Sequence, residues 1–173
     1  MAFEVETGSG SVTANSLCAV DVAVDYWSLR RAPATWTAGT TAQQQVWLVE
    51  ATDYMERRYR LSGKKKTSAQ ALSIPREGWA ERDGPTIADN VVPLRIQYGT
   101  AYLAGVLSEA SFDAKPIAER GGRIASESIS GATSTTYMQD AAREDALLYL
   151  DGLMFPFLSD AGVQDTSARD RMR

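Results

Sequence analysis

Residues 41–61 carry the most regular apolar pattern in the chain, and this pattern constrains the fold most. Apolar and aromatic side chains recur there every three or four residues, as one face of an amphipathic helix requires. Gly63 follows directly and favours the end of a helix. We therefore predict a long helix from about Thr41 to Leu61 that faces a core with Trp47, Leu48, Ala51, Tyr54, Met55, Arg58 and Tyr59.

Three more segments have helical spacing. The first runs from about residue 19 to 31 and is stopped by Pro33, with Trp36 in the loop that follows. The second runs from about 93 to 110, where Pro93 suits a first helical turn, and the third from about 138 to 158. A length of 173 residues fits one domain. We therefore expect a mainly α fold, a small four-helix bundle-like domain.

The remaining segments are rich in turn-forming residues. Residues 64–91 predict a long ordered loop with one helical turn near 69–72, pinned to the core by Leu72, Ile74, Trp79 and Ile87. Residues 121–137 alternate in the manner of a minor β-hairpin. We expect one helical domain over residues 1–158 and a flexible C-terminal tail over 159–173.

The chain has no histidine and one cysteine. This composition excludes Ser-His-Asp and Cys-His catalytic sites, His-ligated zinc and disulfides within the chain. Cys18 is therefore expected to be a small buried thiol. Paired carboxylates, Glu50 with Asp53 and Asp140 with Glu144, leave acid–base or cation chemistry open as a minor alternative. We expect no enzyme activity and no catalytic, cofactor or metal site.

Two features bear on where the protein works. No apolar run approaches the ~20 residues of a membrane-spanning helix. The first six residues lack the basic start and apolar middle of a signal peptide. We therefore expect a protein that is made in the cytoplasm and does not contact membranes.

The charge is unevenly distributed. The net charge is −4, yet six cations and no acid lie within residues 57–66. One interpretation is a surface that contacts the phosphates of DNA, with Tyr54 and Tyr59 stacking on bases. The other is structural, because cations at the end of a helix offset its dipole and tyrosines at helical spacing belong to a core. The DNA-contact candidates are Arg57, Arg58, Arg60, Lys64, Lys65 and Lys66.

The segment Phe155-Pro156-Phe157 ends the last predicted helix. Only one of its two phenylalanines, Phe157, fits the inward stripe of that helix, so the other is directed elsewhere. Both a docking role for the second ring and simple core packing remain open.

The order of several short segments resembles a family of tailed-phage head-tail connector proteins, also known as adaptor or head-completion proteins and often labelled DnaT-like single-stranded-DNA-binding proteins. The segments that carry the resemblance span about residues 4–158. They are Glu6-Thr7-Gly8, Ala14-Asn15-Ser16, Asp25-Tyr26-Trp27, the run from Ala51 to Glu56, the run from Gln70 to Gly78, Asp83-Gly84 and Val92-Pro93, followed by the apolar last helix.

The resemblance implies a structural, non-enzymatic subunit of the virion neck. Such a subunit forms a ring, usually twelvefold, that docks on the portal protein, receives the tail or a stopper protein and lets double-stranded DNA pass through its channel. It further implies portal contacts by the C-terminal segment, for which the candidates are Phe155, Phe157, Val163, Arg169, Arg171 and Arg173. The alternative function is a single-stranded-DNA-binding module that uses the basic segment 57–66.

Overall fold

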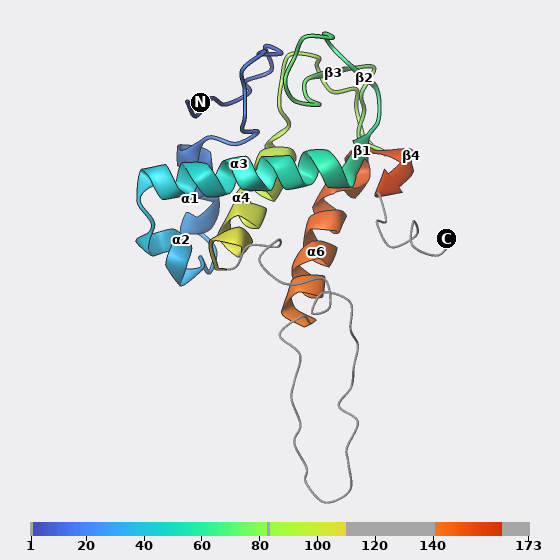
Figure 1. Cartoon of the computed structure of the whole chain (residues 1–173). Coiled ribbons are helices and arrows are strands. Elements are labelled where there is room, and N and C mark those ends of the chain that lie inside the picture. Colours follow the sequence, from blue (N-terminus) through green and yellow to red (C-terminus); the bar gives the residue numbers. More distant parts are fainter. Residues whose placement is uncertain (1, 83, 110–140, 164–173) are drawn as a thin grey trace, which may run out of the picture.

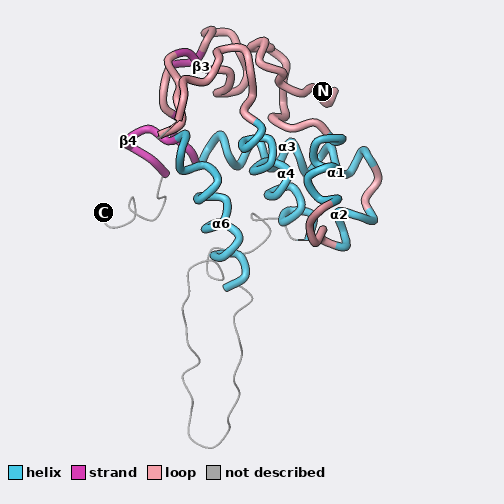
Figure 2. Tube along the Cα trace, turned by 180° about the vertical axis from the view of Figure 1, so that it is seen from behind, coloured by secondary structure: helices cyan, strands magenta, loops and turns pink. Residues whose placement is uncertain are grey.

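The computed structural model describes residues 2–82, 84–109 and 141–163. Its helices are α1 (Val20–Ser28), α2 (Ala34–Ala38), α3 (Thr41–Arg58), α4 (Leu94–Glu109) and α6 (Ala141–Met154). These helices lie together on one side, and a layer of loops covers the other (Figure 2). The prediction of a mainly α fold is confirmed. The predicted hairpin at 121–137 lies outside the described residues.

Helix α3 is the long element across the front of the molecule (Figure 1). It begins with a capping box, in which the Thr40 hydroxyl accepts from the Gln43 amide and the Gln43 side chain accepts from the Thr40 amide. Its buried side chains, among them Leu48, Ala51 and Met55, pack against α4. The predicted end at Leu61 is wrong: the helix ends at Arg58, and β1 (Tyr59–Leu61) follows in extended conformation.

Strand β1 pairs antiparallel with β4 (Leu158–Val163), with Tyr59 opposite Val163 and Leu61 opposite Leu158. Two sequence predictions are corrected here. The last helix ends at Met154 rather than at 158, because Pro156 turns the chain into the 3-10 segment η1 (Phe155–Phe157). The tail predicted from residue 159 begins as a strand, because β1 supplies it with ladder partners; residues 164–173 lie outside the described residues.

Trp36 lies in α2 and not in a loop as predicted. Pro33 ends the preceding segment but occupies the N-cap of this short helix, where its missing amide costs nothing. The Trp36 ring is buried, and its centroid lies 5.9 Å from that of Trp47 on α3. Pro33 therefore marks both the end of the preceding helical segment and the start of α2, and only the first of these was predicted from the sequence.

Helices α1 and α4 pack closely because α4 contains Gly105. The indole nitrogen of Trp27 donates to the Ala101 carbonyl at 3.1 Å, which lays the ring over this part of α4. A β-carbon at Gly105 would lie 2.4 Å from Cζ2 of Trp27. The absence of a side chain at this position therefore sets the distance between the two helices.

The loop layer spans residues 62–92 and the N-terminal segment (Figure 2). Within it, β2 (Lys64–Lys65) pairs with β3 (Arg76–Glu77), and no helical turn forms at the predicted 69–72. The side-chain amide of Gln70 instead donates to the backbone carbonyls of Leu72 and Pro75 and so fixes a non-helical turn. The predicted anchors are confirmed: Leu72, Ile74 and Trp79 are buried, and Ile87 packs against the same core.

A buried carboxylate organises the N-terminal loop. Glu6 is 2% exposed and accepts hydrogen bonds from the backbone amides of Gly8, Gly10 and Ser11 at 2.7, 3.0 and 2.8 Å. Gly8 and Gly10 have φ values of +104° and +76°, which let successive amides converge on one anion. This nest is the structural reason for glycine at positions 8 and 10.

Cys18 is fully buried, as predicted. Burial, and to a smaller degree the charge of Asp21, raises the pKa of its thiol to about 12.

Among the residues that the structure describes, no helix is both long and apolar enough to span a membrane.

A cluster around Asp151 joins the end of α3 to α6. The Asp151 carboxylate accepts two hydrogen bonds from the Arg58 guanidinium, at 3.0 and 2.7 Å, and one from the Tyr59 hydroxyl at 2.6 Å. Burial alone would raise the pKa of Asp151, but these hydrogen bonds and the Arg58 charge hold it below its usual range. Burial and the same carboxylate raise the pKa of Tyr59.

The two helical glycines Gly105 and Gly152 predict opposite effects of the same substitution. Gly105→Ala should lower the free energy of unfolding by about 1–3 kcal/mol, because the new methyl group overlaps the Trp27 ring. Gly152→Ala on α6 meets no atom within 4 Å and should stabilise the protein by about 0.5–1 kcal/mol through helix propensity. Urea unfolding measures both, and destabilisation by the two variants alike would contradict the packing argument.

Asp151→Asn should lower the free energy of unfolding at pH 7 by about 1.5–3 kcal/mol, because it removes the charged acceptor of three hydrogen bonds. The pKa of Asp151 is lower in the folded than in the unfolded protein, so its contribution is complete above the unfolded value of about 3.9 and is lost as the pH falls through the folded value.

Denaturant unfolding between pH 3 and pH 8 checks this dependence. The difference between the wild type and Asp151→Asn should stay constant above pH 5 and shrink below pH 4. Asp25→Asn, at an exposed position of α1, is the matched control and should change stability by less than about 0.5 kcal/mol. A wild-type-to-variant difference that persists unchanged at pH 3 would contradict the role of the charge.

Candidate nucleic-acid interface

The basic segment 57–66 lies at one end of the molecule, where α3 passes into the loop layer (Figure 1). Arg57 and Arg58 end α3, Arg60 lies on β1, and Lys64 and Lys65 form β2. The cations that adjoin in sequence are thus distributed over a helix end and two strands.

The structure separates these cations by their roles. Arg58 is committed to Asp151 and stabilises the fold. Lys66 is partly buried, and its ammonium lies 3.8 Å from a carboxylate oxygen of Asp89. Arg57, Arg60 and the two lysines of β2 are exposed, although Arg57 also donates to a carbonyl of its own helix and Lys65 to the Gln70 carbonyl. Four of the six predicted DNA-contact candidates therefore present their charge to solvent.

Arg76 holds the turn between β1 and β2, and the sequence analysis did not single it out. Its guanidinium donates to the carbonyls of Leu61, Ser62, Gly63 and Ser73. Burial lowers the pKa of this group, and the nearby charge of Glu56 partly opposes that effect. Four backbone carbonyls that converge on one cation fix the direction of the chain just before Lys64. The position of the lysines therefore depends on an arginine that lies outside the basic segment.

The turn η1 lies against the same end of the molecule. The Ser62 amide donates to the Phe157 carbonyl at 3.0 Å, and the Arg82 amide donates to the Pro156 carbonyl at 2.8 Å. The Phe155 side chain is 54% exposed, and the Arg82 guanidinium carbon lies 4.9 Å from the centre of its ring. An exposed aromatic ring and a fifth exposed arginine or lysine thus adjoin the β1–β2 turn.

Phe157 is the inward member of the pair that the sequence predicted. It is fully buried, and its ring centroid lies 5.5 Å from that of Trp79. Its proposed role as a portal contact is therefore corrected, because the ring cannot reach a partner while this core is intact. The two tyrosines predicted to stack on bases do not present a fully exposed ring: Tyr59 is buried, and Tyr54 is half-buried. Phe155 is the aromatic side chain that meets solvent beside the cations.

The other candidates from the C-terminal segment are only partly placed. Val163 is the last residue of β4, opposite Tyr59. Arg169, Arg171 and Arg173 lie outside the described residues. Within the described ranges, no group of three or more Cys, Asp or Glu side chains could hold a metal ion. Of the two carboxylate pairs, Glu50 and Asp53 are exposed on α3, and the side chains of Asp140 and Glu144 are not described.

Comparison with known proteins places the chain in a family. No curated protein and no solved structure matches it significantly. A family model described as "Putative DnaT-like ssDNA binding protein" matches residues 1–172, so the chain belongs to this family.

Proposed function

We propose that this protein binds single-stranded DNA with the surface formed by Arg57, Arg60, Lys64, Lys65, Arg82 and Phe155, which we term the basic end. The observation that carries the proposal is an exposed aromatic ring beside the exposed Arg82, on a turn that is hydrogen-bonded to Ser62 between the other exposed cations. The description of the family supports the same function.

The chemistry of the basic end suits a single strand better than a duplex. Proteins that bind single strands without sequence preference combine cations that follow the phosphates with aromatic rings on which bases stack. Phe155 offers such a ring, because bases of a single strand are free to leave their neighbours. In a duplex the bases are paired and stacked, so an exposed phenylalanine would gain little.

The overall charge limits the binding to this end. The chain carries a net charge of −4 although the basic end is positive, so the rest of the surface repels phosphates. A strand is therefore held by the few cations of the basic end and not wrapped around the molecule. We expect short site sizes and an affinity that falls with added salt.

A second candidate function is that of a structural head–tail adaptor in a phage neck. It is favoured by large apolar side chains on the exposed surface of α6, where Leu148 is 66% and Tyr149 is 47% exposed. A monomer gains nothing from exposing these groups, whereas a subunit of a ring would bury them against its neighbours. In that role the protein would bind the portal protein and a tail or stopper protein, would work without a cofactor or enzymatic activity, and would be located in the virion.

Titration of a fluorescent oligothymidine at several salt concentrations tests the first function. Replacing both exposed lysines, Lys64→Gln with Lys65→Gln, should weaken binding and lower the slope of log K against log salt by about 1.4, since each phosphate contact to a single strand contributes about 0.7. The charge-matched control is Arg31→Gln with Arg95→Gln, two exposed arginines outside the basic end.

The control should leave the slope within about 0.5 of the wild-type value if contact at the basic end, and not net charge, decides binding. In the same titration, Phe155→Ala should weaken binding about 5- to 150-fold through lost stacking, whereas Phe155→Tyr should retain it. Equal effects of the lysine and arginine pairs, or no effect of Phe155→Ala, would refute the proposed surface.

Sedimentation with purified portal rings tests the adaptor function. The wild type should form rings or cosediment with the portal, and Leu148→Glu should abolish this assembly because it places a charge in an apolar contact. Val12→Glu is the matched control, because Val12 is 64% exposed on the N-terminal loop and should leave assembly intact. A wild-type protein that remains monomeric and ignores the portal would contradict this function.

A further inference from the structure

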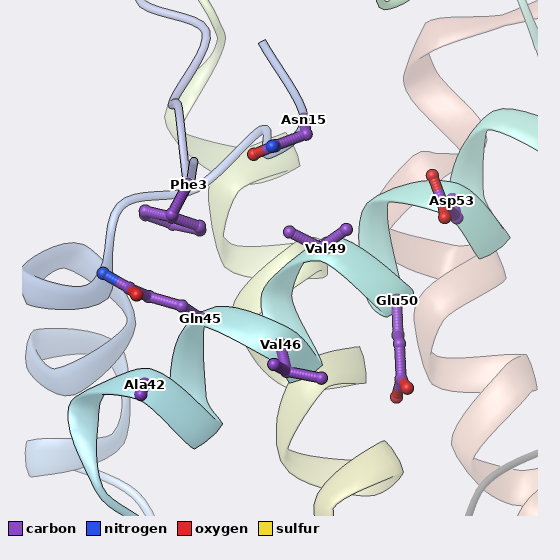
Figure 3. A pocket seen from close by; sticks show the side chains of 8 residues that line it. All are labelled: Phe3, Asn15, Ala42, Gln45, Val46, Val49, Glu50 and Asp53. Atoms are coloured by element: carbon purple, nitrogen blue, oxygen red, sulfur yellow. The ribbon is translucent and has the colours of Figure 1, made fainter. Parts of the chain in front are cut away.

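A groove of about 430 Å³ runs along α3, on the half of the helix away from the basic end. Phe3 and Asn15 of the N-terminal segment form one side, and side chains from successive turns of α3 form the other (Figure 3). No residue that lines the groove belongs to the proposed DNA-binding surface, although the Arg57 side chain donates a hydrogen bond to the Asp53 carbonyl at 3.1 Å. An inference from the groove does not depend on the proposed DNA binding.

The middle of the groove is apolar. Phe3 and Val49 are partly exposed there, and Val46 is 55% exposed although it is a large aliphatic side chain on a regular helix. Exposed apolar groups in a concave site favour an occupant that brings apolar surface of its own.

One end of the groove is acidic. Glu50 and Asp53 are exposed, lie three residues apart on α3 and both line the groove, with their carboxylates pointing away from each other (Figure 3). Neither carboxylate forms an ion pair with another residue in the described parts of the chain. An occupant that combines an apolar side chain with cations would complement both parts of the groove.

The chain itself contains such a segment. Residues 164–173 end in Arg169-Asp170-Arg171-Met172-Arg173, where three arginines surround one methionine and one acid. Methionine is unbranched and adapts well to irregular apolar surfaces. Arginine presents donors in a planar fork that matches a carboxylate.

The geometry lets this segment reach the groove. Strand β4 ends at Val163 opposite Tyr59, the residue that directly follows α3. At about 1.5 Å per residue, Asp53 lies about 9 Å and Val46 about 20 Å from Tyr59 along the helix. Ten extended residues span up to about 34 Å, so Arg171 and Met172 can reach both positions with slack.

We propose that residues 164–173 dock in this groove of the same chain, with Met172 against Phe3 and Val46 and the arginines on Glu50 and Asp53. The docked segment would cover the exposed apolar part of α3 and neutralise its acidic end. It would also tie the C-terminus to the helix that carries the basic end.

Disulfide trapping in the full-length protein tests this docking. A Val46→Cys, Met172→Cys variant should close a disulfide within one chain at least about tenfold faster than the control Val24→Cys, Met172→Cys, because docking raises the local concentration of the two thiols. Val24 is a matched control, since it is an exposed valine of α1 at 45% exposure. Native Cys18 is fully buried and stays out of the exchange.

Added Glu50→Gln and Asp53→Asn substitutions should slow the closure about two- to tenfold, because they remove the carboxylates and leave the apolar part intact. As a second measurement, the thiol of a single Val46→Cys variant should react faster with a soluble thiol reagent when Arg169, Arg171 and Arg173 are all changed to Gln.

Equal closure rates in the two cysteine pairs would overturn the proposal, as would an unchanged thiol reactivity in the arginine variant. A disulfide that joins two chains instead of closing within one would also overturn it, because it would assign the groove to a second copy. None of these results would alter the binding of oligothymidine at the basic end, so the two proposals can fail separately.

Discussion

The hydrogen bonds from Arg58 and Tyr59 to Asp151 hold together the parts of the fold that carry the proposed DNA-binding surface. They fix the end of α3 to α6 across 93 residues of sequence, and they place β1 beside the segment that becomes β4. Because Arg58 neutralises Asp151, the carboxylate adds no negative charge beside the exposed lysines. Arg58 therefore stabilises the fold, and the surface around the neighbouring cations of the basic segment stays positive.

The helices could be predicted from sequence because their signals are local. The apolar stripe of α3 and the proline before α4 act within a few residues, and both elements begin where expected. The loop anchors Leu72, Ile74 and Trp79 were also visible, since apolar side chains in a turn-rich segment have few other reasons to be there. In contrast, α3 ends where β1 begins, and β1 forms because it pairs with β4, about 100 residues away. No local sequence pattern predicts β4.

The candidate site shows the same division. A cluster of cations is plain in the sequence, but the distinction between Arg58, which stabilises the fold, and Lys64, which faces solvent, depends on the distant Asp151. The role of Arg76 could not be predicted, because a single arginine in a loop belongs to no recognisable sequence pattern. Only the structure shows that it donates to four backbone carbonyls. For Phe155 and Phe157, the helical spacing predicted that Phe157 faces inward, and its burial against Trp79 confirms this.

The two proposed functions use different forces and different surfaces, so one molecule can perform both. Binding at the basic end would be electrostatic and would weaken as salt screens the phosphates. Association through Leu148 and Tyr149 would be apolar and would not be weakened by screening. The basic end is built on α3, β1, β2, η1 and the loop residue Arg82, whereas the apolar groups lie on α6. A strand held by the basic end would therefore not cover the apolar groups. A ring of such subunits would present one basic end per subunit to DNA, while the acidic remainder of each surface would keep the strand from adhering elsewhere.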